Sequence, residues 1–141
     1  METVVDLDEA AAEVAARRPG WEAAGAGLAV GRVTWREGAA PGPHGLETDR
    51  SRVADPDALG VLLSGPADTL LSVVLFRGGW ADVDYAAGPD DAGVLPGAGI
   101  GSAAAFGARL DAWVTRVFGA HLPSTARSRS PRPVAAEACP V

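Results

Sequence analysis

The chain has 141 residues, of which 48% are hydrophobic, and this fits one domain with a single core. Its formal net charge of −6 argues against a nucleic-acid-binding protein, because such proteins rely on basic contacts to phosphate. The acidic first residues do not resemble a signal peptide, and the longest apolar run, residues 69–76, is too short to cross a bilayer. The single cysteine, Cys139, excludes an internal disulfide and favours a reducing compartment. We therefore expect a cytoplasmic protein with no membrane partner.

The first predicted element is a helix over residues 6–18. Asp6 can cap its N-terminus, with Glu9 as the partner in a capping box. The Pro19-Gly20 pair is expected to end the helix. Its apolar stripe is thin, which predicts that the helix covers an edge of the fold.

A first strand is predicted over residues 28–35. The alternation of apolar and polar residues in this strand is interrupted between Val30 and Val33, which indicates a bulge near Gly31. Residues 38–57 are rich in glycine, proline and charge and predict a loop. A second short strand is expected over residues 58–64.

The strongest local signal is a hairpin. Residues 70–77 and 80–86 flank Gly78-Gly79, and a two-residue Gly-Gly turn with both glycines at positive φ would join them. The first of these strands is apolar on both faces, which predicts a central strand covered on both sides. The second alternates between apolar and acidic residues. Residues 94–95 are a candidate for one further short strand.

The last predicted element is an amphipathic helix over residues 103–118, which Gly119 would end. Its core stripe is Phe106, Leu110, Trp113 and Val117, at spacings of four, three and four. The expected fold is α+β: an N-terminal helix, a mainly antiparallel sheet of about four strands, and a C-terminal amphipathic helix packed on the sheet. Residues 1–121 would form this single domain.

Residues 122–141 are rich in proline, serine and arginine, and we expect a disordered tail. Three arginines and one glutamate give this tail a charge of +2, so a chain charge of −6 leaves −8 on residues 1–121. Cys139 is expected to be an incidental exposed thiol, because no ordered base can be held beside it.

The segment Gly97 to Ser102, GAGIGS, resembles a phosphate-binding loop at first sight. The spacing is not that of a dinucleotide loop, no second strand follows, and the chain has no lysine for a P-loop. Ser102 is expected instead to cap the following helix. Gly99, Gly101 and Ser102 remain a possible anion site at the helix N-terminus.

Asp82 and Asp84 lie on one face of the second hairpin strand, with Asp90 and Asp91 just beyond it. Four carboxylates can bind a divalent metal, but the spacing is not that of an EF-hand. His44 and His121 show no metal-ligand spacing either. We therefore expect no metal and no cofactor.

Trp80 shares a face with Asp82 and Asp84 at the tip of the hairpin. An aromatic side chain beside carboxylates is a common composition for a protein-binding hot spot. The alternative is that Trp80 packs under the C-terminal helix. On the first interpretation, Trp80, Asp82 and Asp84 are the candidate partner-binding residues.

All basic side chains are arginine, and lysine, asparagine and glutamine are absent, a bias typical of GC-rich genomes. Within residues 69–119, the segments VLFRGGWADVDYAAG and GIGSAAAFGARLDAWVTRVFG resemble the C-terminal half of small actinobacterial immunity-type proteins of polymorphic toxin systems. The resemblance implies an α+β domain that acts by binding and neutralises a cognate toxin. The acidic body would suit a basic toxin domain.

The sequence thus predicts a non-catalytic protein-binding domain. The alternative is a small-ligand or anion-binding domain, or an enzyme, with a cleft near residues 97–102 lined also by His44 or Arg109. A third interpretation is a subunit of a larger assembly, since the sequence does not define the oligomeric state.

Overall fold

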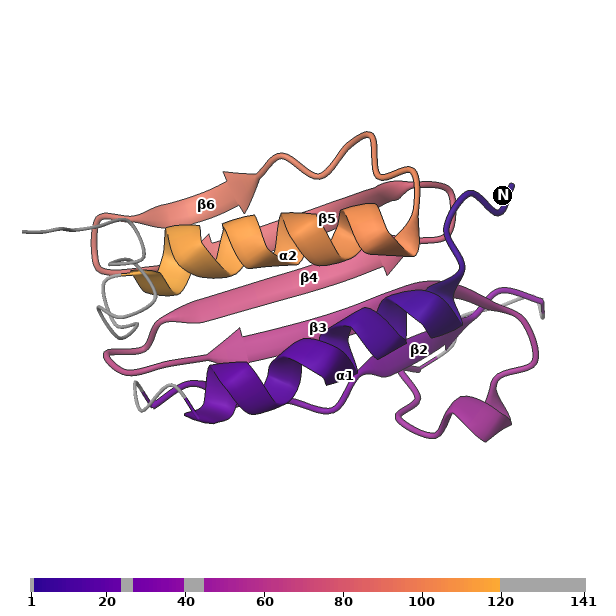
Figure 1. Cartoon of the computed structure of the whole chain (residues 1–141), viewed down its shortest axis with the longest axis horizontal. Helices are drawn as coiled ribbons and strands as arrows, with labels where there is room; N and C mark the ends of the chain where they lie inside the picture. Colours follow the sequence, from indigo (N-terminus) through magenta and orange to yellow (C-terminus); the bar gives the residue numbers. More distant parts are fainter. Residues whose placement is uncertain (1, 24–26, 40–44, 120–141) are drawn as a thin grey trace, which may run out of the picture.

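The computed structural model describes residues 2–23, 27–39 and 45–119, and it has two helices packed on one face of an antiparallel sheet (Figure 1). The elements, in chain order, are α1 (Leu7–Ala23), β1 (Ala29–Val30), β2 (Thr34–Glu37), the 3₁₀ helix η1 (Arg50–Arg52), β3 (Pro56–Ser64), β4 (Leu70–Phe76), β5 (Trp80–Ala86), β6 (Ala92–Leu95) and α2 (Ala103–Phe118). The predicted α+β class is confirmed. The predicted tail over residues 122–141, with Cys139, lies outside the described residues.

The sheet has six strands in its described part, where the sequence predicted about four. Its order is β1-β3-β4-β5-β6, β2 also pairs with β3, and every pairing is antiparallel. The single strand expected over residues 28–35 is divided into β1 and β2, and β6 is longer than the two residues anticipated. The predicted loop over 38–57 contains η1, and β3 begins inside it, at Pro56.

Helix α1 continues five residues beyond the predicted end and includes Pro19. A proline inside a helix removes one backbone hydrogen bond. Here Trp21, in the last turn, is buried in the core, and this burial offsets the loss. Arg18 also donates to the carbonyl oxygens of Val30 and Gly31, at 2.6 and 2.8 Å, and so ties the helix to the strand that follows it.

The hairpin between β4 and β5 has a three-residue turn, Arg77 to Gly79, rather than the predicted two-residue turn. Of the two glycines only Gly79 has a positive φ, of 100°, and its N–H donates to the carbonyl of Phe76 at 3.0 Å. The same turn receives two distant segments. The N–H groups of Val4 and Val5 donate to the carbonyl of Arg77, and the N–H of Ile100 donates to the carbonyl of Gly79.

The core lies between the helices and the near face of the sheet. The predicted stripe of α2 is confirmed, because Phe106, Leu110, Trp113 and Val117 are all buried. The strand residues in this core are Leu59, Val61, Leu63, Leu71, Val73, Leu75 and Val83. The prediction that β4 is covered on both sides is wrong: both helices lie on the same face (Figure 1), and Leu70 on the opposite face is exposed.

Candidate functional site

The uncovered face of the sheet gathers most of the candidate residues, and we call it the open face. Side chains alternate between the two faces along a strand, and paired residues share a face. The register therefore assigns to the open face Thr34, Arg36, Ala58, Gly60, Leu62, Leu70, Ser72, Val74, Phe76, Trp80, Asp82, Asp84 and Val94. Leu62, Trp80 and Val94 are 47%, 41% and 73% exposed, so this face carries apolar surface that the described fold does not cover.

An aromatic pair stands at one end of the open face. The rings of Phe76 and Trp80 are stacked, with centroids 5.1 Å apart and an interplanar angle of 19°. The Arg36 guanidinium lies 5.3 Å from the Phe76 ring centroid and forms two hydrogen bonds with Asp57, at 2.7 and 2.8 Å. Asp57 raises the pKa of Arg36 through these bonds. The structure places Trp80 away from α2, which excludes the predicted alternative of packing under that helix.

The carboxylates of Asp82 and Asp84 follow Trp80 at alternate positions along β5, and both are exposed. Within the described residues neither has a hydrogen-bond or ion-pair partner. Their cross-strand neighbours on β4 are Val74 and Ser72. Two unpaired carboxylates thus lie beside apolar surface, where a basic partner group can reach them.

Asp91 does not join this pair of carboxylates. It accepts a hydrogen bond from the Tyr85 hydroxyl at 2.7 Å and pairs with Arg116 of α2 at 3.0 Å. Arg116 and then Tyr85 lower the pKa of Asp91, and the bond to Asp91 raises the pKa of Tyr85. Among the described residues no group of three or more His, Cys, Asp or Glu side chains is placed to hold a metal ion.

A hollow of about 290 Å³ lies in the open face beside Asp82, and we call it the Gly60 hollow. Its lining consists of Thr34, Arg36, Leu46, Ala58, Gly60, Val74, Phe76 and Asp82. Gly60 is mid-strand in β3, and a Cβ there would overlap the Oγ1 atom of Thr34. The absence of a side chain at Gly60 makes room for the Thr34 hydroxyl, which takes the place that a Cβ would occupy at this edge of the hollow. Sequence reasoning missed it, although a glycine inside a strand is a known sign of close approach or of a ligand.

The segment Gly97 to Ser102 lies against the sheet. The Gly97 carbonyl accepts from the N–H of Ala81 at 2.7 Å, and a Cβ at Gly97 would overlap the Ala81 carbonyl oxygen. Ile100 is buried, and Ser102 caps α2 by accepting from the N–H of Ala105 at 3.0 Å, as predicted. Gly97 therefore serves packing, whereas a Cβ at Gly99 or Gly101 would meet nothing within 4 Å, and Gly99 has a positive φ of 72°.

Arg109 and His44 were expected to line a cleft beside this segment, and the structure describes the first of them. Arg109 donates to the carbonyls of Ala98 and Pro96, at 2.9 and 2.8 Å, so it braces the segment. Gly99, Gly101 and Ser102 are exposed, and their role as an anion site stays a prediction. His44 and His121 lie outside the described residues.

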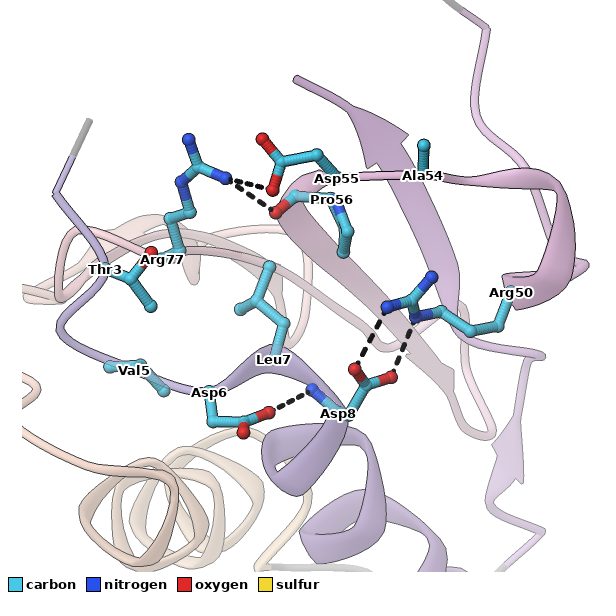
Figure 2. Close-up of a pocket in the computed structure, with 10 residues that line it drawn as sticks. All are labelled: Thr3, Val5, Asp6, Leu7, Asp8, Arg50, Ala54, Asp55, Pro56 and Arg77. Atoms are coloured by element: carbon cyan, nitrogen blue, oxygen red, sulfur yellow. Dashed lines mark hydrogen bonds and ion pairs between the residues drawn. The ribbon is translucent and has the colours of Figure 1, made fainter. Parts of the chain in front are cut away.

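A second hollow, of about 240 Å³, lies between the N-terminal segment, the η1 loop and the hairpin turn (Figure 2). Arg50 pairs with Asp8 through two bonds, and Arg77 pairs with Asp55 at 2.7 Å. Arg50 lowers the pKa of Asp8. The Nε atom of Arg77 is buried and has no hydrogen-bond partner in the described part of the chain. The ion pairs tie the start of α1 to the loop before β3, which is a structural role.

Two findings concern the chain as a whole. No helix in the described ranges is both long and apolar enough to span a bilayer. Comparison with protein-family models, with curated proteins and with solved structures found no match.

Proposed function

We propose that this chain is a non-catalytic protein-binding domain that binds its partner through the open face, with Trp80, Asp82 and Asp84 as contact residues. One observation carries the proposal: a stacked, half-exposed aromatic pair and two carboxylates without a partner among the described residues share a face that the helices leave uncovered. Aromatic side chains in a partly apolar surface are typical anchors of protein interfaces.

The negative charge of residues 1–121, which we call the body, favours a basic partner. Residues 1–121 carry −8 and the tail carries +2, so the acidic charge lies on the body. Such a body attracts a basic protein over a long range and steers its approach. A basic toxin domain that an immunity protein blocks in the cytoplasm is a partner of this kind.

The test is a binding titration with the candidate partner. The candidate is a toxin-like domain encoded beside this chain, and the measurements are affinity and its salt dependence. Asp82→Ala with Asp84→Ala should weaken binding and flatten the salt dependence, because two attractive charges are removed. The matched control is Glu9→Ala with Asp90→Ala, which removes the same charge from α1 and from the turn after β5. Equal affinity of both double variants would contradict the assignment of Asp82 and Asp84.

The alternative function, a ligand or anion site at residues 97–102, rests on the exposed N-terminus of α2. Titration with inorganic phosphate, followed by the amide resonances of Gly101 to Ala103, tests it. Saturable shifts confined to these amides would support that function and disfavour the open face as the main site.

A further inference from the structure

The Gly60 hollow has a polarity that specifies what fits it. The register aligns Thr34, Gly60, Val74 and Asp82 in one row across four strands. Most of the lining of the hollow is apolar, Thr34 and Arg36 are polar members of it, and Asp82 lies at the β5 end of the row. The hollow thus joins one apolar cavity to one unpaired negative charge.

We propose that the Gly60 hollow is the socket for one large apolar side chain of the partner, and that Asp82 pairs with an arginine or lysine adjacent to that side chain. This inference rests on the proposed function, because it assumes that the open face is the binding face. It adds the chemistry of the partner: a basic segment with an apolar residue beside a cation.

The size and walls of the hollow favour an apolar anchor. A volume of about 290 Å³ admits one leucine or phenylalanine side chain. Leu46, which is 70% exposed, and Phe76 form walls that an inserted side chain would bury further. Burial of an apolar side chain between such walls is a main source of affinity at interface hot spots.

The charges around the hollow favour a cation beside the anchor. Arg36 also lines the hollow, but Asp57 already neutralises it through two hydrogen bonds. Asp82 has no such partner among the described residues. Exclusion of water by an apolar anchor would strengthen a pair between Asp82 and an incoming cation.

The test is an NMR titration of the labelled full chain with three synthetic peptides. They share glycine and serine flanks and have the centres Arg-Leu-Arg, Arg-Ser-Arg and Glu-Leu-Glu. The Arg-Leu-Arg peptide should shift the amides of Gly60, Val74 and Asp82 and bind at least about tenfold more tightly than Arg-Ser-Arg. The Glu-Leu-Glu peptide should bind more weakly still, because Asp82 repels it.

Two variants locate the effect. Asp82→Asn keeps the shape of the hollow and should weaken binding of the Arg-Leu-Arg peptide by about fivefold, a change expected for a partly exposed ion pair. Gly60→Ala forces its methyl group against the Thr34 hydroxyl, so the Thr34 side chain must move within the hollow, and the variant should abolish the shifts at Val74. Gly101→Ala is its control, since a Cβ there meets nothing within 4 Å. Amide spectra of each variant without peptide report whether it is folded.

Equal shifts by all three peptides, shifts elsewhere in the chain, or none at millimolar peptide would overturn this inference. The proposed function fails in a different way. If a protein partner loses affinity with Trp80→Ala but not with Gly60→Ala or Asp82→Asn, the open face is the interface and the socket is wrong. If none of these variants affects the partner, the open face itself is wrong.

Discussion

The two faces of the sheet use the same strands for opposite purposes. On β5, Ala81 and Val83 are buried beneath the helices, whereas Trp80, Asp82 and Asp84 point to the open face. On β4, Val73 is fully buried and its neighbour Val74 is only half-buried. Burial of apolar side chains on the helix-covered face stabilises the fold. The open face carries exposed apolar surface and the carboxylates of Asp82 and Asp84, which are available to a partner. We therefore expect substitutions on the helix-covered face to lower mainly the stability of the fold, and substitutions on the open face to lower mainly the affinity for a partner.

The largest effect is expected in the middle of the helix-covered face. Phe106 of α2 is completely buried and contacts Trp113 edge-on, with ring centroids 6.3 Å apart. Phe106→Ala should lower the free energy of unfolding by about 3–5 kcal/mol, because it removes buried area and leaves a cavity. Urea denaturation measures this loss. A change below about 1 kcal/mol would mean that the helix does not close the core.

The sharpest comparison uses two adjacent valines. Val73→Ala should cost about 2–3 kcal/mol of unfolding free energy, because its side chain is fully buried. Val74→Ala, on the open face, should cost less than about 1 kcal/mol. Both are measured by the same urea denaturation. Similar losses in the two variants would show that the open face is also covered.

Trp80→Ala tests the opposite effect. It should reduce partner affinity by about 2 kcal/mol, as expected for an aromatic hot spot. It should lower the free energy of unfolding by only about 0.5–1.5 kcal/mol, because the half-exposed ring loses its stacking on Phe76. Calorimetric titration and thermal unfolding report the two quantities. A large fall in stability with unchanged affinity would assign Trp80 to the fold rather than to the interface.

The smallest expected effect is on the pH dependence of stability, to which Asp91 contributes through its ion pair with Arg116 of α2. The pKa of Asp91 is below its ordinary value of 3.8 in the folded chain, because Arg116 and Tyr85 hydrogen-bond to the carboxylate. Its contribution to stability is therefore complete above pH 3.8 and is lost as pH falls through the lower, folded pKa. In Asp91→Asn the decline of stability in this acid range should be shallower. Chemical denaturation at a series of acidic pH values checks the slope, and an unchanged slope would assign the decline to other carboxylates.

Sequence reasoning succeeded where the signal is local. The spacing of Phe106, Leu110, Trp113 and Val117 fixed the buried side of α2, and Ser102 marked its first turn. Sequence reasoning failed where contacts between residues far apart in the sequence determine the structure. The extension of α1 past Pro19 depends on the place of Trp21 in the core, which no neighbouring residue reveals.

The candidate site was partly predictable for the same reason. Alternation along β5 placed Trp80, Asp82 and Asp84 on one face without any tertiary information. The apolar residues on both sides of β4 were ambiguous, because a covered face and a binding face have the same composition. The hollow at Gly60 depends on the neighbours that β2 and β4 provide, and their register is set by long-range pairing.

The hairpin turn Arg77 to Gly79 has a consequence for the order of folding. Its two strands are local in sequence, and their pairing closes only a short loop. The segments before both helices are hydrogen-bonded to this turn through Val4, Val5 and Ile100. A formed hairpin thus offers the template on which both ends of the domain assemble. Gly79 has a positive φ, and a Cβ there would approach the Ile100 carbonyl to 2.8 Å. We therefore expect Gly79→Ala to slow folding more than it speeds unfolding, and stopped-flow folding and unfolding rates showing this would place the turn in the folding nucleus.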